Sequence, residues 1–133
     1  MSVQVPPNCD LTLGLVCVDK SEPGVSMWQM RVDERFLNPA GIVQGGFLAA
    51  ALDSAMGASA VTSTRGKKVS VANTEMKISF IRSAQSGDIL TCTARVLKPG
   101  TTIAFVEGRI ENQKGDLVAT ASSTYLIRER AVG

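Results

Sequence analysis

The segment Gly45–Thr62, GGFLAAALDSAMGASAVT, constrains the fold more than any other part of the sequence. Its length and its content of Ala, Leu and Met predict a helix, and Gly66 beside basic residues is typical of a helix end. Asp53 is its one charged residue, so the helix has no charged stripe. Such a helix should be covered nearly all round, and we therefore expect a sheet that wraps around it.

The strands for this sheet lie mainly after the helix. Leu11–Val18 and Val25–Val32 read as two short strands before it, joined to it by a loop over DERFLNPAG. Four long segments rich in Val, Ile and Thr follow it: Val69–Ile81, Asp88–Leu97, Thr102–Asn112 and Asp116–Arg128. The short Gly-containing connections between them predict adjacent antiparallel hairpins. The sequence therefore predicts an α+β fold, with an antiparallel sheet of five or six strands around one long helix.

Size and composition indicate a single globular domain over residues 1–133, with 44% hydrophobic and 20% charged residues. The net charge of +2 is too small to indicate nucleic acid or an acidic membrane surface as a partner. The polar first ten residues do not resemble a signal peptide, and the apolar helix is too Gly-rich for a membrane span. Cys9, Cys17 and Cys92 show no CxxC spacing, so we expect reduced thiols, no metal site and a cytoplasmic location.

The chain contains no histidine. Ser-His-Asp and Cys-His nucleophile systems are therefore excluded, together with most catalytic zinc sites. Any acid–base chemistry must use carboxylates, Lys, Tyr, hydroxyl groups or water.

Asp53 is the first candidate for such chemistry. Helical spacing surrounds it with small or apolar residues and no cation: Ala49, Ala50, Met56, Gly57 and Ala60. A mid-helix Asp commonly points to solvent or to a partner elsewhere in the fold. In these surroundings we instead expect a partly desolvated carboxylate that faces a cleft.

The start of the helix is the second candidate. The sequence QGG places Gly45 and Gly46 where helical N–H groups have no intrahelical partner. Glycine lets a ligand approach this backbone closely, and the helix dipole favours a developing oxyanion. A simple turn would also explain two glycines here, but Asp53 eight residues later makes a site the sharper interpretation.

The stretch NPAGIVQGGFLAAALDSAMG resembles the motif of hotdog-fold acyl-CoA thioesterases of the PaaI-like group, which are related to phenylacetic acid degradation. The residues that match are Asn38, Gly41, Gly45, Gly46 and Asp53. The later NTEMKISFIRSAQSGD is similar to the long strand of that family and the segment after it. The order of strands and helix agrees from about Leu11 to Arg128, so the resemblance implies a hotdog fold for nearly the whole chain.

The resemblance also implies roles for individual residues. Asp53 would be the catalytic carboxylate, as nucleophile or as general base for water, and the Gly45 N–H would polarise the thioester carbonyl. Asn38 would orient that carbonyl, while Asn73 and Thr74 would hold the attacking water or the thioester. The implied substrate-binding residues are Gln44, Gly46, Thr74, Arg82, Thr101 and Thr102, the last three at the nucleotide of CoA. No cofactor is implied, because CoA is part of the substrate.

Gln44 departs from the family, which usually has His at this position. An amide can donate and accept a hydrogen bond but cannot change charge near pH 7. We favour a positioning role for Gln44, because Asp53 alone can provide base or nucleophilic chemistry.

Helix geometry separates the two ends of this site. Eight residues correspond to about 12 Å, so one carbonyl cannot contact both Gly45 and Asp53 of the same chain. A two-fold dimer with antiparallel helices would bring Gly45 of one subunit towards Asp53 of the other. We therefore expect a homodimer with shared active sites, in agreement with the family, and dimers that pair into tetramers stay an open alternative.

Other functions are less compatible with the sequence. A hotdog hydratase would use His with a carboxylate, and the chain has no His. A non-catalytic acyl-CoA-binding protein would keep the fold without needing Asp53. The small residues near Asp53 leave room for an aryl or medium-chain acyl group, and the sequence does not decide between them.

Overall fold

The computed structural model describes residues 5–130; residues 1–4, part of the polar N-terminal segment, and 131–133 lie outside the described residues. One long helix and six strands make up most of the fold. In chain order the elements are α1 (Asn8–Leu13), β1 (Val16–Asp19), β2 (Val25–Arg31), the 3-10 helix η1 (Glu34–Phe36), α2 (Gly45–Thr62), β3 (Val69–Phe80), β4 (Ile89–Lys98), β5 (Ile103–Glu111) and β6 (Leu117–Glu129).

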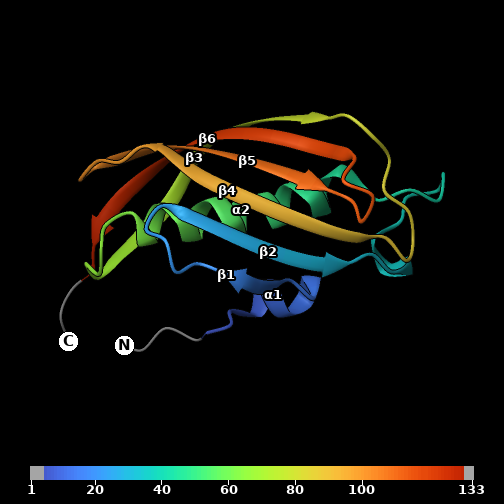
Figure 1. Cartoon of the computed structure of the whole chain (residues 1–133), viewed down its shortest axis with the longest axis horizontal. Helices are drawn as coiled ribbons and strands as arrows, with labels where there is room; N and C mark the ends of the chain where they lie inside the picture. The colour runs from blue at the N-terminus through green and yellow to red at the C-terminus, as the bar shows by residue number, and fades with distance from the viewer. Residues whose placement is uncertain (1–4, 131–133) are drawn as a thin grey trace.

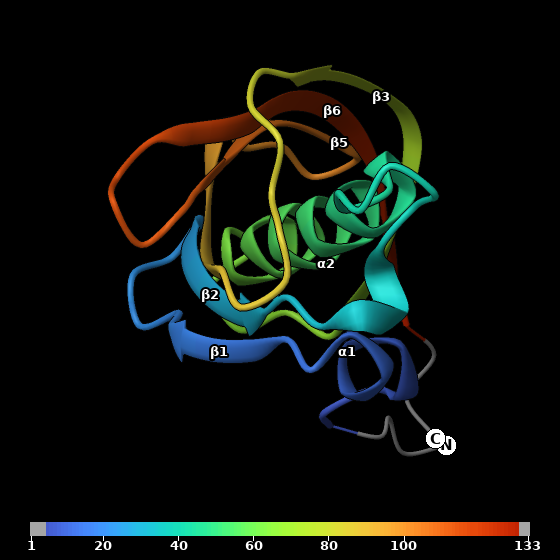
Figure 2. The ribbon, with the colours of Figure 1, turned by 90° about the vertical axis from the view of Figure 1, so that its right-hand side faces the viewer.

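The six strands form one sheet in the order β1-β2-β4-β5-β6-β3, and every neighbouring pair is antiparallel. The sheet lies in front of α2 in Figure 1 and curls around it in the end-on view of Figure 2. The predicted α+β fold, with an antiparallel sheet of up to six strands around one long helix, is confirmed. This is the hotdog arrangement that the sequence predicted.

One predicted strand neighbour is wrong. The short connection after β3 suggested a β3–β4 hairpin, but β3 pairs with β6, and β4 lies between β2 and β5. The connecting segment instead crosses from the sheet edge to its middle, past the start of α2. The Val43 N–H donates to the Ala84 carbonyl and the Val32 N–H to the Asp88 carbonyl, each at 2.9 Å, which fixes this crossing. As a result β3 is an edge strand.

The N-terminal prediction is also wrong in part. Leu11–Val18 is not one strand: α1 ends at Leu13, Gly14 follows at φ +67°, and β1 begins only at Val16. A glycine in the left-handed region is a common helix stop because other residues are strained there. The predicted loop before α2 also contains the short η1 turn.

The core lies between α2 and the concave face of the sheet. Seven helix residues are buried there: Leu48, Ala51, Leu52, Ala55, Met56, Ser59 and Ala60. Gly108 on β5 lets the helix lie close to the sheet, because a Cβ at Gly108 would be 3.0 Å from Leu52 Cδ2 and 3.2 Å from Met56 Cγ. Close packing of this kind makes the position of the helix sensitive to small changes in volume.

The helix is not covered all round, in contrast to the prediction. Gly46, Ala50, Asp53 and Val61 are exposed and follow one side of α2 at helical spacing. The strand order leaves β1 and β3 as the two edges of an open sheet, and this stripe of the helix stays uncovered between them. A helix that is apolar all round therefore has an exposed face in the single chain.

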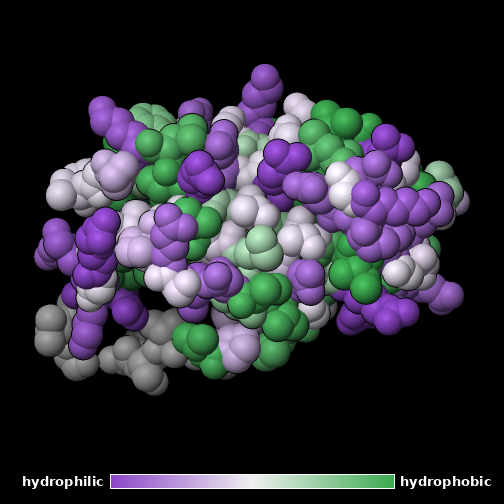
Figure 3. All heavy atoms as spheres, in the orientation of Figure 1, coloured by the Kyte–Doolittle hydropathy of each residue, from purple (hydrophilic) through white to green (hydrophobic). Residues whose placement is uncertain are grey.

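The convex face of the sheet carries polar and apolar side chains side by side (Figure 3). Along β5, exposed and buried residues alternate, with Phe105 and Arg109 among the outward side chains and Val106 and Ile110 among the inward ones. No helix within residues 5–130 is both long and apolar enough to span a membrane.

Candidate active site

Asp53 lies in the middle of α2 and accepts two hydrogen bonds on one oxygen. The Tyr125 hydroxyl donates to Asp53 Oδ1 at 2.6 Å, and Asn73 Nδ2 donates to the same atom at 3.2 Å. Among the described residues Asp53 forms no ion pair. Both donors are neutral side chains, and both contact the same carboxylate oxygen.

The expected burial of Asp53 is wrong for the single chain, in which this residue is exposed. The reason is the open stripe of α2, which the sheet does not reach. Of its neighbours on the helix, Ala50 is exposed and Ala49 and Gly57 are partly exposed, whereas Met56 and Ala60 face the core.

Tyr125 is a site residue that sequence reasoning missed. This residue is 1% exposed on β6, and the main-chain oxygen of Asp53 lies 3.0 Å from its hydroxyl as a second, longer acceptor for the same proton. Burial, followed by the hydrogen bond to Asp53, raises the pKa of this hydroxyl well above its ordinary value. The available signal was the alternation of β6, which places Ser123 and Tyr125 on the inner face, where a buried hydroxyl needs a partner.

Asn73 reaches the same point from β3, next to a β-bulge between Asn73 and Glu75. Its Nδ2 lies 3.3 Å from both Ser123 Oγ and Tyr125 Oη, in addition to Asp53. The structure therefore brings Asn73 together with Asp53. The hydroxyl of Thr74 instead donates to the carbonyl of Thr124 at 2.9 Å, on the exposed side of the bulge.

The start of α2 presents free backbone donors. Gln44 caps the helix, and its own N–H donates to the Phe36 carbonyl at 2.9 Å, but its side chain makes no capping bond. Within residues 5–130 the N–H groups of Gly45 and Gly46 make no backbone hydrogen bond. Two such groups at a helix N-terminus can donate to a carbonyl oxygen that gains negative charge.

Asn38 shapes the loop that leads into this helix start. Its Oδ1 accepts from the N–H of Ala40 at 2.9 Å and of Ile42 at 3.3 Å, and Gly41 adopts φ +80° within the turn. This Asx-type turn orders the loop. The contacts of Asn38 thus lie at the helix start, on the same side of the molecule as Gln44 and Gly45.

Within one chain the predicted site residues do not all lie together. Gly45 and Asp53 are eight residues apart on α2, or about 12 Å along its axis. Arg82 lies at one end of β6, where its N–H donates to the Val118 carbonyl at 3.2 Å. Thr102 lies at the other end, where its carbonyl accepts from Ile127 at 2.7 Å. Val118 and Ile127 are nine positions apart on the strand, about 30 Å, so one chain does not bring Arg82 and Thr102 together.

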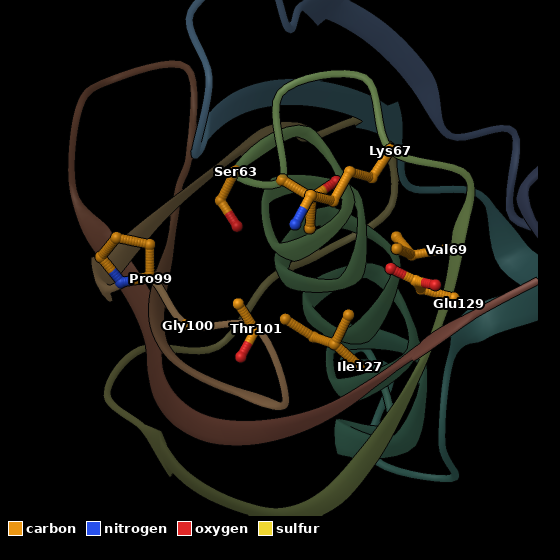
Figure 4. A pocket seen from close by; sticks show the side chains of 9 residues that line it. Ser63, Lys67, Val69, Pro99, Gly100, Thr101, Ile127 and Glu129 are labelled. Carbon is orange, nitrogen blue, oxygen red and sulfur yellow. The ribbon is translucent and has the colours of Figure 1, made fainter.

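Thr101 lines a cavity of about 270 Å³ beyond the C-terminal end of α2 (Figure 4). The other residues around it are Ser63, Thr64, Lys67, Val69, Pro99, Gly100, Ile127 and Glu129. Asp53 does not line this cavity. The cavity and the carboxylate are therefore separate features.

Comparison with known proteins gives the family of the chain and relatives of its fold. Residues 40–119 match the family described as Thioesterase superfamily. The chain is 31% identical over 119 residues to acyl-coenzyme A thioesterase 13 of Homo sapiens, covering 88% of this chain and 83% of that protein. The solved structure of a phenylacetic acid degradation-related protein from Ralstonia eutropha JMP134 is 36% identical, with a TM-score of 0.81 over 93% of this chain and 92% of the other. The E. coli PaaI protein, at 24% identity, shares the fold with a TM-score of 0.84 over 96% and 87% of the two chains.

The chain is thus a hotdog-fold protein. It belongs to the thioesterase superfamily, in its PaaI-like group. The predicted family and the prediction of a thioesterase enzyme are confirmed.

Proposed function

We propose that the protein hydrolyses the thioester bond of an aryl- or medium-chain acyl-CoA to the free acid and CoA, with residues 1–133 as one hotdog thioesterase domain. The observation that carries this proposal is the Asp53 carboxylate. It stands on an exposed stripe of α2, is held by Tyr125 and Asn73, and has no cation partner among the described residues. A carboxylate in this state can attack a carbonyl carbon or remove a proton from water.

The helix start would provide the second half of the chemistry. The Gly45 N–H would donate to the thioester carbonyl and stabilise the oxyanion that forms when the carbon is attacked. Gly46 leaves the approach open, since nothing lies within 4 Å of a Cβ at that position. Gln44 and Asn38 would orient this end of the site, the latter through the turn that it builds.

A homodimer would join the two halves. The edge strand β3 has one side without a strand partner, and long free edges are usually covered. Antiparallel pairing of two β3 edges about a two-fold axis would place Asp53 of one subunit near the Gly45 of its partner. Each dimer would then have two shared sites. Pairing of dimers into tetramers is compatible with this arrangement.

The same dimer accounts for the two CoA-binding groups. Thr101 and Thr102 lie near the end of β6 that contains Tyr125. Arg82 lies near the other end of β6, towards the start of α2. Two-fold pairing would bring Thr101–Thr102 of one subunit to the same side as Arg82 of the other. Lys67, at the cavity that Thr101 lines, adds a positive charge for a phosphate group.

A hydrolysis screen tests the proposal. The purified protein is assayed on phenylacetyl-, benzoyl-, hexanoyl-, decanoyl- and palmitoyl-CoA by the release of free thiol. We expect higher kcat/KM for the aryl and medium-chain substrates, because the small residues around Asp53 leave space for an acyl group of limited size. No hydrolysis of any of them would contradict the proposed reaction, and a clear preference for palmitoyl-CoA would contradict the acyl group.

A further inference from the structure

The two oxygens of the Asp53 carboxylate have different surroundings. Oδ1 accepts from the Tyr125 hydroxyl at 2.6 Å and from Asn73 Nδ2 at 3.2 Å. Among the described residues Oδ2 accepts no hydrogen bond. An oxygen that accepts a short charge-assisted bond is less able to react, since the donor stabilises its negative charge. The contacts therefore distinguish an anchored oxygen from a reactive one.

Tyr125 is well placed to be the anchor. It is 1% exposed, and its hydroxyl also lies 3.0 Å from the main-chain oxygen of Asp53. One phenol group thus contacts both the backbone and the carboxylate of the same residue. The ring edge packs against the helix, where a Cβ at Gly57 would be only 3.6 Å from Cε1. This fixes the carboxylate relative to its own backbone and limits its rotation.

Asn73 supports the anchor from the neighbouring strand. Its Nδ2 contacts Asp53 Oδ1, the Tyr125 hydroxyl and Ser123 Oγ within 3.3 Å. Its Oδ1 is buried and has no hydrogen-bond partner among the described residues. Reversing the amide would place that oxygen against the carboxylate, so the charge of Asp53 selects the observed orientation. Both anchoring donors therefore converge on the same oxygen.

We propose that Tyr125 is a positioning residue for Asp53, which holds Oδ1 so that Oδ2 is the oxygen that reacts. The inference rests on the proposed function, since it needs Asp53 to be catalytic.

In the nucleophilic route, Oδ2 forms a bond to the acyl carbon and the C–S bond breaks. Water then cleaves the mixed anhydride, releases the acid, and provides the proton for the thiolate. In the base route, Oδ2 takes a proton from water while the water oxygen attacks the acyl carbon. The C–S bond breaks, and the proton passes to the leaving sulfur. In both routes Oδ2 is the atom that must face the substrate.

A second buried hydroxyl also binds the main chain of α2, and it serves as a control for a purely structural role of Tyr125. Ser26 on β2 is buried, and its Oγ donates to the main-chain oxygen of Ala55 at 2.9 Å and lies 2.8 Å from Ser59 Oγ. It attaches α2 to the sheet without contact to Asp53. Ser26→Ala is therefore a matched control for the loss of a buried hydroxyl that binds this helix.

The test is a double-mutant cycle of Tyr125→Phe and Asp53→Asn, with Ser26→Ala as control. We expect Tyr125→Phe to lower kcat by about 10- to 100-fold with KM changed less than about twofold, as a misplaced reacting group does. Ser26→Ala should keep kcat. The double variant should be no slower than Asp53→Asn alone, because Tyr125 acts only through Asp53.

Three outcomes would contradict either the positioning role of Tyr125 or the catalytic role of Asp53, and the measurements distinguish them. A normal kcat in Tyr125→Phe, with Asp53→Asn strongly impaired, removes the positioning role but leaves the proposed function intact. Additive losses in the double variant show that Tyr125 acts independently of Asp53. Normal hydrolysis in Asp53→Asn removes the proposed function itself.

A spectroscopic readout tests the contact without relying on activity. The chain has a single tyrosine, so 3-fluorotyrosine incorporation labels Tyr125 alone. We expect its ¹⁹F resonance to shift in Asp53→Asn and to stay unchanged in Ser26→Ala. An unchanged resonance in Asp53→Asn would show that the hydroxyl does not sense the charge of the carboxylate, and would overturn the inference.

Discussion

The ring of Phe80 lies against Gly45, so that a Cβ at position 45 would be 2.7 Å from Phe80 Cζ. We therefore expect Gly45→Ala to displace the helix start from the ring and to lower kcat/KM about tenfold, through misplaced N–H donors. Phe80 is 54% exposed and can move, so the free energy of unfolding should change little. Steady-state kinetics and urea unfolding measure both effects.

The contact with Phe80 can be separated from other effects of the alanine. In Gly45→Ala/Phe80→Ala the clash is absent, and we expect part of the lost activity to return relative to Gly45→Ala. An equal or larger loss in the double variant would show that the ring does not set the position of Gly45.

Arg82 provides a test of CoA binding. It is exposed and lies 4.0 Å from Asp116, too far for a strong ion pair, so its charge is available to a phosphate. Arg82→Ala should raise KM with kcat little changed. Arg109→Ala is the control, because Arg109 pairs with Glu111 on the sheet and should leave both constants unchanged. A fall in kcat at constant KM would show that Arg82 is misassigned.

Shared sites predict complementation between inactive subunits. Asp53→Asn and Gly45→Val should each be inactive alone. After mixing and exchange of subunits, half the dimers are mixed, and each mixed dimer has one intact site out of two. Activity should therefore return to about a quarter of the wild-type value. If no mixing ratio restores activity, the site lies within one chain.

Cys92 predicts a pH dependence of stability. Burial raises the pKa of its thiol from 9.0 to about 12. Above pH 9 the thiol ionises in the unfolded chain but not in the folded one. The free energy of unfolding then falls by about 1.4 kcal/mol per pH unit until the folded pKa is reached.

The comparison of wild type with Cys92→Ala isolates this effect. The stability advantage of the wild type should shrink by roughly 2 to 3 kcal/mol between pH 8 and pH 11, measured by urea unfolding. A difference that stays constant over this range would contradict a buried, neutral thiol.

Local patterns predicted much of the fold. The bounds of α2 coincide with the predicted Gly45–Thr62, because composition and the following Gly66 both mark its end. The last four strands agree within a few residues, since runs of Val, Ile and Thr between short turns are a local property.

Strand pairing and solvent exposure were harder to predict. The β3–β6 pairing joins residues that lie far apart in sequence, such as Val69 and Glu129, and no short turn indicates it. The exposed stripe of α2 was missed because the helix is apolar on every side. The periodicity of its residues therefore does not indicate which side faces solvent. A single sequence does not show where an open sheet stops covering such a helix.

The candidate site shows the same limit. Asp53 and Gly45 could be identified from residue type and spacing along one helix. Tyr125 could not, because it reaches Asp53 from a strand 72 residues further along the chain. The positions of Arg82 and Thr102 at opposite ends of β6 likewise depend on strand register, which composition does not determine.

The central claim, that Asp53 is the catalytic carboxylate, is tested most directly by Asp53→Asn. Asparagine keeps the size of the side chain, and its Oδ1 can still accept from Tyr125, so the free energy of unfolding should change by less than about 1 kcal/mol. A gain in stability from removing a buried charge is not expected, because Asp53 is exposed. Hydrolysis of the best acyl-CoA from the screen should fall by a factor on the order of 10² or more, with acyl-CoA still bound. Near-normal turnover together with a less stable protein would contradict the account and make Asp53 a structural residue.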